Sequence, residues 1–362
     1  MRIVEAVLEL AYITDIKTLA YGFVACFLTG FVLVLTKRWH GAFSMDFTQG
    51  IQKFHTTPTP RIGGIPILIG LLVVLIKSSL EIKEIIAPIL LAGMPAFLFG
   101  MAEDLTKRVG VMQRLTATML SGLLVCYITD YSLTRLDILG LDALLKITLI
   151  SVIFTAFALA GVANSINIID GFNGLATITC VISFTGIALI AQQVGDSDLA
   201  MTSLLFATCI AGFFWINWPF GKMFLGDGGA YFIGFSLAWL AVLLIERNKS
   251  VSAFSALMIC ILPITEVLFS IYRRKIRNTN PGEPDRLHFH SILQRRYISR
   301  WFIFLPNLIN NSIVGIIVGM MSLASSFLAN IFFDSTLLCV LMSGLMAFIY
   351  ILIYLRMIRH RW

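Results

Sequence analysis

Charged residues are scarce in this 362-residue sequence: they make up 13% of it, about half of the share that is usual in soluble proteins. Cysteine is also rare. The six cysteines stand singly in apolar segments, without a C-x-x-C pair or metal-ligand spacing. These shortages exclude a secreted domain, a disordered chain and a soluble enzyme. What the sequence has instead is 58% hydrophobic residues, which indicates a helical protein that crosses a membrane many times.

Apolar runs long enough for a membrane helix, about 20 residues each, recur along the whole chain. We therefore predict an all-α, polytopic integral membrane protein with about eleven spans, forming a single transmembrane catalytic domain over residues 1–362. The expected spans are 16–36, 63–79, 85–102, 114–129, 146–163, 175–192, 198–216, 229–246, 252–272, 310–330 and 336–355.

Positive charge is divided unevenly between the two sides of such a bundle. Nineteen of the 27 Lys and Arg residues, and all five histidines, fall on one side. The positive-inside rule makes this side cytoplasmic, which puts the N-terminus outside and the C-terminus inside. The net charge of +7 then indicates sidedness and an attraction for anionic ligands, not for nucleic acid. The expected cytoplasmic loops lie near 37–62, 103–113, 164–174, 217–228 and 273–309.

Two adjacent acids, Glu103 and Asp104, stand where the third span ends. Side by side they repel each other unless a cation lies near. Such a pair can bind Mg²⁺ or accept a proton. The alternative is simple ion pairing with Lys107 and Arg108.

Three polar residues, Asn164, Asn167 and Asp170, recur at every third position at the end of another span, and Asn173 follows. On a helix the three share one broad face. Amides and a carboxylate on an apolar helix are costly without partners, so we predict a ligand site there. Helix capping by Asp170 or Asn173 is the alternative.

Asp227 lies between glycines at the start of a span, five residues after Lys222. Glycine leaves room for a ligand or a metal beside the carboxylate. The alternative is that Asp227 serves only as a helix N-cap.

Two further loops carry basic residues that suit phosphate oxygens. They are Lys53, His55 and Arg61 before the second span, and Arg286, His288 and His290 after the ninth. No cysteine or further histidine accompanies the second set, so a cationic phosphate clamp is favoured over zinc. Rigid linkers and solvated loops that only set the topology are the alternatives.

Glu266 stands about two turns inside the ninth span. Burying an acid at that depth costs roughly 2.5–3.5 kcal/mol, so we predict a structural pair with a basic or polar neighbour.

Taken together, carboxylates beside Lys, Arg and His on one face suit a magnesium–diphosphate ligand. Phosphoryl transfer needs mainly positioning and charge neutralisation. A site at the bilayer surface suits one lipid and one water-soluble substrate.

Five segments carry a resemblance to a known family: HTTPTPRIGG, GMAEDLTKRV, NSINIIDGFNGLA, KMFLGDGGAYFIG and DRLHFHS. With these, in this order between about residues 53 and 295, the sequence resembles the polyprenyl-phosphate N-acetylhexosamine-1-phosphate transferases, a group that includes phospho-MurNAc-pentapeptide translocase. The resemblance covers roughly two thirds of the chain.

The resemblance implies transfer of a sugar 1-phosphate, in all expectation N-acetylhexosamine 1-phosphate, from a UDP-sugar to undecaprenyl phosphate, with release of UMP. The implied cofactor is Mg²⁺, with Mn²⁺ as the alternative ion. The implied place is the bacterial inner membrane, with the site facing the cytoplasm, at the first membrane step of a cell-surface polysaccharide such as O-antigen or capsule. The sugar and a homodimeric state are left open.

The resemblance also assigns roles to residues. Asp227 matches the magnesium-binding aspartate, and Asp104 matches the second member of an acidic pair, a candidate base and further metal ligand. Glu103, Asn167 and Asp170 complete the expected catalytic set. The expected substrate-binding set is Lys53, His55, Arg61, Asn164, Asn173, Lys222, Arg286, His288 and His290.

Two positions depart from the family pattern: Glu103 replaces the usual aspartate, and Ser291 stands where a further histidine is common. Both changes are compatible with activity and with another sugar donor. A transporter and a non-catalytic scaffold are the alternative functions. A transporter would place acids at mid-membrane on broken helices of two related halves, whereas only Glu266 lies away from the ends of an expected span and no internal repeat is visible.

Overall fold

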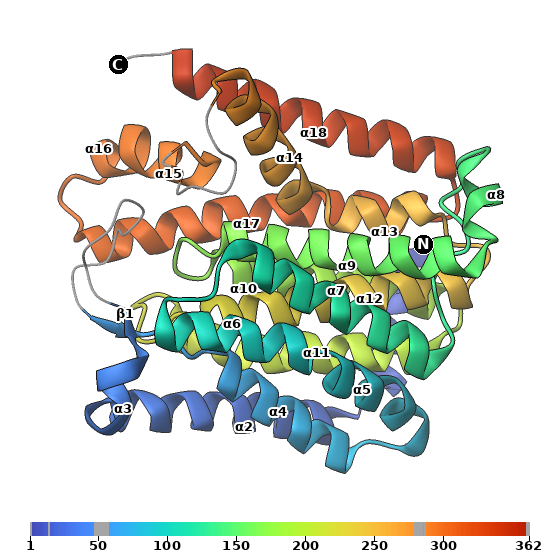
Figure 1. The fold of residues 1–362 in the computed structure, drawn as a ribbon, viewed down its shortest axis with the longest axis horizontal. Coiled ribbons are helices and arrows are strands. Elements are labelled where there is room, and N and C mark those ends of the chain that lie inside the picture. Colours follow the sequence, from blue (N-terminus) through green and yellow to red (C-terminus); the bar gives the residue numbers. More distant parts are fainter. Residues whose placement is uncertain (1, 14, 47–57, 279–284, 286, 360–362) are drawn as a thin grey trace.

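The computed structural model describes residues 2–13, 15–46, 58–278, 285 and 287–359. Over these residues the chain is a bundle of long helices that run side by side (Figure 1), as the apolar runs predict. The described strands are two short ones, β1 (Met45–Asp46) and β2 (Thr59–Pro60), which pair antiparallel. The prediction of an all-α polytopic membrane protein is therefore confirmed.

Eight helices of the described chain are long and apolar enough to cross a membrane. They are α2 (Ile16–Leu35), α7 (Val111–Thr129), α9 (Thr148–Ile169), α10 (Leu175–Gln193), α11 (Ser197–Asn217), α12 (Gly226–Arg247), α17 (Asn307–Phe332) and α18 (Thr336–Arg359).

Two bent pairs raise this number to ten within the described residues, if each pair is one span. They are α5 (Leu80–Ala92) with α6 (Met94–Thr106), bent by 44°, and α13 (Ala253–Ile259) with α14 (Ile261–Ile276), bent by 77°. At the place of the second expected span lies α4 (Gly64–Lys77), a shorter apolar helix of 14 residues. Each of the eleven expected spans is thus helical, and their orientation in the membrane stays a prediction.

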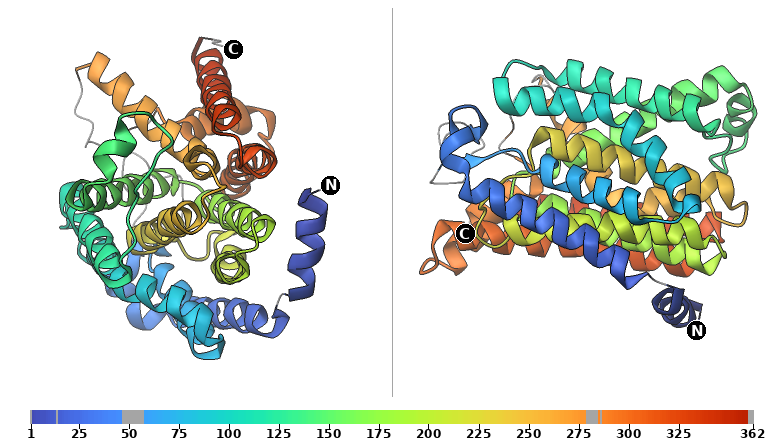
Figure 2. Two further views of the ribbon diagram at one scale, coloured as in Figure 1. Left: turned by 90° about the vertical axis from the view of Figure 1, so that its right-hand side faces the viewer. Right: turned by 90° about the horizontal axis from the view of Figure 1, so that it is seen from below.

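Short elements lie at the ends of the bundle and beside it. They are α1 (Arg2–Ile13), α3 (Lys37–Ser44), α8 (Leu141–Leu145), α15 (Phe289–Leu293), the π-helix η1 (Gln294–Ile298) and α16 (Ser299–Trp301). α3 and α16 lie at one end of the bundle and α8 at the other (Figure 1). α1 lies at the edge of the bundle (Figure 2), where its Glu9 accepts a hydrogen bond from Gln192 Nε2 of α10 (3.3 Å).

The central helix is α12, which is buried along its membrane-crossing length. Glycines let its neighbours approach the first turn closely, as is common where membrane helices cross. A methyl group added to Gly100 of α6 would lie 2.6 Å from the Cα of Gly228. One added to Gly64 of α4 would lie 2.7 Å from the backbone nitrogen of Gly229. The start of α12 is therefore enclosed by α4 and α6.

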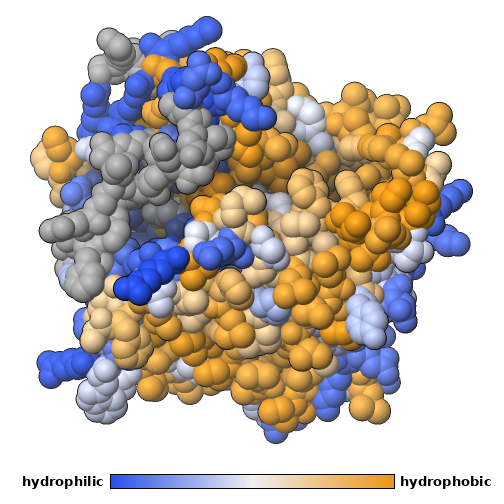
Figure 3. Space-filling model, in the orientation of Figure 1, coloured by the Kyte–Doolittle hydropathy of each residue, from blue (hydrophilic) through white to orange (hydrophobic). Residues whose placement is uncertain are grey.

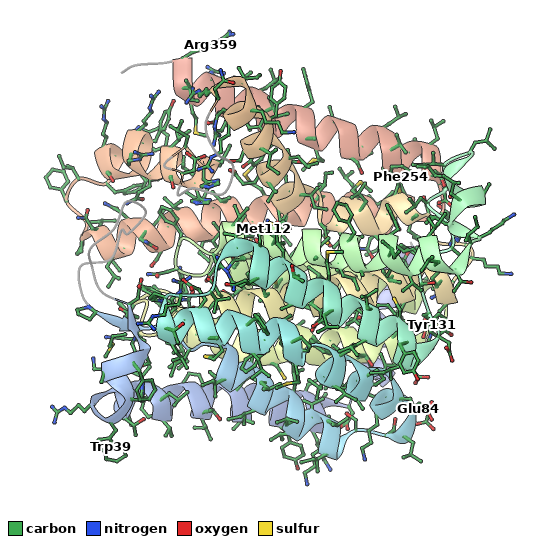
Figure 4. All side chains as sticks on the ribbon, viewed as in Figure 1. Trp39, Glu84, Met112, Tyr131, Phe254 and Arg359 are labelled. Atoms are coloured by element: carbon green, nitrogen blue, oxygen red, sulfur yellow. The ribbon has the colours of Figure 1, made fainter. Side chains whose placement is uncertain are left out.

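Large apolar side chains cover the outside of the bundle. They are exposed along α2, for example at Val24, Leu28 and Val32. In Figure 3 hydrophobic residues fill the middle of one face, and hydrophilic residues gather towards its two ends. Trp39 marks one end, and Glu84 and Tyr131 mark the other (Figure 4). An apolar belt between polar ends is the surface that a bilayer requires.

Candidate active site

Asp104 caps the start of α12 from a neighbouring helix. It lies in the last turn of α6, and its carboxylate is buried. Oδ1 accepts a hydrogen bond from the backbone N–H of Asp227 (2.9 Å), and Oδ2 accepts one from Gly228 (2.8 Å). The first amides of a helix have no partner within it. Asp104 therefore provides the N-cap of α12, the role that the alternative interpretation assigned to Asp227. A Cβ at Gly226, whose φ is +75°, would lie 2.6 Å from Asp104 Oδ2.

Asp227, one residue into α12, is buried among donors. Its Oδ1 accepts hydrogen bonds from Asn167 Nδ2 (3.0 Å) and from the Arg61 guanidinium. Arg114, in the first turn of α7, pairs with the other oxygen. Arg61 also reaches Asp104, with Nε 3.1 Å from Oδ1. The carboxylates predicted for metal and catalysis thus share one arginine and lie in one place.

The polar face of α9 is turned towards α12, as the three-residue spacing predicts. Besides Asn167, Asn164 accepts a hydrogen bond at Oδ1 from the hydroxyl of Tyr231 (3.0 Å). The Arg114 guanidinium lies 5.7 Å from the centre of that same tyrosine ring. Tyr231 therefore links the second amide to the arginine that holds Asp227.

Asp170 completes the group of carboxylates. It is the C-cap residue of α9, and its carboxylate accepts a hydrogen bond from the Gly226 amide. Burial raises the pKa of Asp170 to about 8, against the lowering effect of Arg61 and with a further raising effect of Asp104. A carboxyl group that is held neutral by burial is a place where a cation would be favourable.

Backbone pairing brings two of the predicted segments into contact. The Phe224 amide donates to the Pro60 carbonyl (2.8 Å), and the Gly63 amide donates to the Phe224 carbonyl (3.0 Å). The segment before α4 therefore runs along the segment before α12, and this places Arg61 over Asp227.

Three predicted site residues have partners away from these carboxylates. Glu103 accepts a hydrogen bond from the Val109 amide (2.8 Å) and so holds the turn after α6. Asn173 is buried, and its Nδ2 donates to Ser312 Oγ of α17 (3.2 Å). Lys222 is exposed, with Nζ 5.8 Å from the ring centre of Phe220.

The histidine segment packs against the loop that carries Asp170. His288 Nδ1 lies 2.7 Å from Glu266 Oε1, so Glu266 has the polar partner that was predicted. His290 stacks on His288 and contacts the ring of Phe172. Burial lowers the pKa of His290 to about 3, so its ring is neutral at pH 7 and is not the cation that a phosphate clamp was expected to supply. Lys53, His55 and Arg286 lie outside the described residues.

Two residues in the site were missed by sequence reasoning. Arg114 entered only as a charge at a span border, although an arginine entering an apolar helix ten residues after Asp104 is itself a signal. Asn217, at the end of α11, accepts from the Gly174 amide (2.5 Å) and donates to the Met223 carbonyl (2.8 Å). It ties the Asp170 and Asp227 segments together, and its only signal was an amide at the end of an apolar run.

The donor set fits a magnesium ion that is shared with a substrate. Mg²⁺ usually binds one or two carboxylates together with substrate phosphates and waters. Asp227, whose oxygens pair with arginines, and Asp170 would offer such carboxylates if the arginines moved to substrate phosphates, whereas both oxygens of Asp104 accept hydrogen bonds from backbone amides. Among the described residues no group of three or more His, Cys, Asp or Glu side chains is arranged to hold a metal.

Known proteins share this part of the chain. Residues 86–245 match the sequence model described as glycosyl transferase family 4. A probable undecaprenyl-phosphate N-acetylglucosaminyl 1-phosphate transferase of Bacillus subtilis (strain 168) is 29% identical over 248 residues, 66% of this chain and 66% of the relative. Undecaprenyl-phosphate alpha-N-acetylglucosaminyl 1-phosphate transferases are 26% identical in Salmonella typhi, over 67% of each chain, and 26% identical in Thermotoga maritima, over 77% of this chain and 81% of the relative. The chain thus covers about two thirds of the length of the first two relatives.

Proposed function

Because the chain belongs to glycosyl transferase family 4, we propose that it transfers an N-acetylhexosamine 1-phosphate from a UDP-sugar to undecaprenyl phosphate and releases UMP. One observation carries the proposal: three aspartates and two arginines, each from a different one of five segments, meet at the first turn of α12, at the end of the membrane spans. The names of the relatives supply the acceptor and the class of sugar.

The arginines suit the diphosphate of the donor. Arg61 and Arg114 both pair with Asp227, and guanidinium groups bind phosphate oxygens as readily as carboxylates. When bound at Asp227 and Asp170, Mg²⁺ would neutralise charge on the phosphates. The carboxylates would hold the ion, and Arg61 and Arg114 would bind phosphate oxygens.

The proposed reaction is a displacement at phosphorus. A phosphate oxygen of the lipid attacks the phosphorus that carries the sugar, the bond from that phosphorus to the bridging oxygen breaks, and UMP leaves with the electron pair. A phosphate monoester has a second pKa of about 6, so the acceptor is largely ionised at neutral pH and needs little help from a base. With both oxygens on α12, Asp104 then serves to position Asp227.

An apolar groove supports a lipid acceptor. α14 and α18 enclose a space of about 700 Å³, lined mainly by apolar side chains such as Ile264, Leu268 and Ile351. Arg273 and Arg277 line it as well, near the end of α14. Such a groove can hold part of an isoprenoid chain while its phosphate stays with the basic residues. By the positive-inside rule this end faces the cytoplasm of a bacterial cell.

The test is a panel of UDP-N-acetylhexosamines incubated with the purified protein, undecaprenyl phosphate and Mg²⁺, scored for UMP release. We expect release with at least one donor, dependent on both the lipid and the ion. A relative with known activity is assayed in parallel as a positive control. If that control is active and the folded protein releases no UMP with any donor, the proposal is overturned.

A second measurement separates the two possible routes. Exchange of labelled UMP into the UDP-sugar without lipid acceptor requires a covalent sugar-phosphate on the enzyme. We expect no such exchange, because the direct displacement forms no intermediate on the chain.

A further inference from the structure

A second buried carboxylate, Glu266, stands outside the cluster at α12. It lies in α14 and is 2% exposed. The residues on either side of its helix position, Ile264, Thr265 and Leu268, line the groove between α14 and α18. Glu266 itself points the other way, into a small cavity that His290 and Tyr350 also line.

Three donors meet the Glu266 carboxylate. His288 Nδ1 lies 2.7 Å from Oε1, the Phe289 amide donates to Oε2 (3.2 Å), and the Tyr350 hydroxyl of α18 donates to Oε2. One side chain of α14 thus binds α18 and the beginning of α15. A buried carboxylate in such a network is expensive to disturb, because each donor that loses its acceptor is left without water.

His288 connects Glu266 to the loop that carries Asp170. Its ring stacks on that of His290, with centres 5.4 Å apart and planes at 14°. His290 in turn lies against Phe172, with ring centres 5.1 Å apart. A methyl group at Gly171 would lie 3.2 Å from His290 Nε2, so the loop next to Asp170 is in close contact with this ring.

The same two groove helices hold the segment at a second point. Arg273 of α14 donates to the Leu287 carbonyl (2.9 Å), and the Tyr354 hydroxyl of α18 donates to that carbonyl as well (2.9 Å). Both side chains also line the groove. The histidine segment is therefore fixed to the groove on one side and touches the carboxylate loop on the other.

We propose that Glu266 is a positioning residue for the transfer reaction: through His288 it fixes His290 against the loop of Asp170 and so sets the phosphate end of the acceptor groove relative to the carboxylates. This inference rests on the proposed function. Glu266 touches no substrate in this arrangement and acts only through the histidines.

The decisive variant is Glu266→Gln. Glutamine has the same shape but one acceptor oxygen, and its NH₂ group would face either His288 or the Phe289 amide and Tyr350. We expect the kcat of UMP release to fall by about tenfold, the change that follows when a buried donor loses its partner. The KM for the UDP-sugar should change less than about twofold, since Arg61, Arg114 and the aspartates are untouched. Tyr350→Phe removes one donor and should lower kcat by a smaller factor.

Ser343→Ala is the matched control. Ser343 lies in α18, is buried, and its hydroxyl has no hydrogen-bond partner within the described residues. Loss of this hydroxyl should leave kcat and both KM values unchanged.

A double-variant cycle distinguishes positioning from a general effect on folding. If Glu266 acts through His288, then Glu266→Gln adds little to the loss of kcat already caused by His288→Asn, with rates expressed per folded enzyme. Losses that multiply, or a wild-type kcat in Glu266→Gln, would overturn the inference. Should Glu266→Gln fail to fold, Tyr350→Phe and its cycle with His288→Asn decide in the same way.

Different results overturn this inference and the proposed function. If the wild type is active, either a wild-type kcat in Glu266→Gln or losses that multiply in the double variant overturn this inference alone. A wild type that releases no UMP overturns the proposed function, and this inference with it.

Discussion

Two aspartates at opposite ends of the bundle, Asp137 and Asp170, have opposite electrostatic surroundings. Asp137 lies in the loop before α8. Its Oδ1 accepts from Arg135 (2.8 Å), and its Oδ2 accepts from the Ser252 hydroxyl (2.9 Å) and the Ala253 amide (2.9 Å). Burial alone would raise its pKa, but these hydrogen bonds and the arginine lower it below the ordinary value. Hydrogen-bond donors and an arginine of the protein thus stabilise the charged form of this carboxylate.

Asp170 shows the opposite shift, because burial raises its pKa to about 8. Arg61 pairs with Asp104 and Asp227 and only partly offsets the raised pKa of Asp170, and Arg114 pairs with Asp227. One aspartate with one arginine at the Asp137 end forms a closed structural cluster. At the Asp170 end the two arginines pair with Asp104 and Asp227, and burial holds Asp170 neutral. The difference indicates that a functional site is to be sought where burial shifts the pKa of a carboxyl group strongly away from its ordinary value.

The largest expected effect belongs to Asp227→Asn. Asparagine keeps the shape and one acceptor for Asn167, but it loses the charge that holds Arg61 and Arg114. We expect UMP release to fall by about a hundredfold or more, because electrostatic groups at a reacting phosphate contribute losses of that size. The loss should be measured per folded enzyme, because removal of a buried charge that pairs with two arginines also lowers stability. Activity near that of the wild type would remove Asp227 from the reaction.

Arg114→Gln comes next. The variant removes the cation that lies between Asp227 and the Tyr231 ring, and we expect kcat to fall by about tenfold or more. Arg135→Gln is the matched control at the other end of the bundle, where the guanidinium donates to the carbonyls of Ile245, Asn248 and Val251. That control should lower the unfolding temperature and leave kcat unchanged. Equal effects of the two variants on kcat would contradict the comparison.

Asp104→Asn separates a positioning role from a role as base. An amide offers one acceptor oxygen where the carboxylate offers two, so either the Asp227 or the Gly228 amide loses its cap. The expected cost is about 1 kcal/mol of stability, with a loss of activity of about fivefold. A loss above a hundredfold in stable protein would instead support the base that the family resemblance suggested for Asp104.

The position of Asp104 shows what sequence reasoning could and could not supply. The apolar runs predicted the helices, and the spacing of Asn164, Asn167 and Asp170 predicted that they share a face, since both are properties of local sequence. The hydrogen bond from the Asp227 amide to Asp104 joins positions 123 residues apart. No local pattern distinguishes such a cap from a metal ligand or a base.

The bend between α13 and α14 was not predicted, for a related reason. The run 252–272 is continuous and apolar, so it predicted one straight span, yet the chain bends by 77° between the two helices. The bend lets Glu266 reach His288 and Tyr350, contacts that depend on tertiary packing and not on hydropathy. The sequence predicted only that Glu266 has a basic or polar partner, and this is confirmed. Which residues these partners are could be learned only from the structure.

The pH dependence of stability should differ in sign between the two aspartates. For Asp170 the folded pKa is raised, so stability is fully present below the unfolded pKa of about 4 and is lost as the pH rises towards about 8. In metal-free protein, Asp170→Asn should therefore raise the unfolding temperature by more at pH 8 than at pH 5. Added Mg²⁺ should stabilise the wild type at pH 8 and the variant less. A constant difference across this range would contradict the raised pKa.

Asp137→Asn should have the smallest effect on the reaction, with UMP release within about twofold of the wild type. Its effect is on stability: the folded pKa is lowered, so the carboxylate stabilises the fold above the unfolded pKa of about 4 and loses this effect as the pH falls through the folded value. The variant should unfold at a lower temperature at pH 7, and the difference should shrink on acidification. The partners Ser252 and Thr336 stand at the starts of α13 and α18. A loss of kcat in this variant would therefore show that this end of α13 and α18 is coupled to the carboxylates at α12. It would contradict the division between a structural cluster at Asp137 and a functional cluster at Asp170.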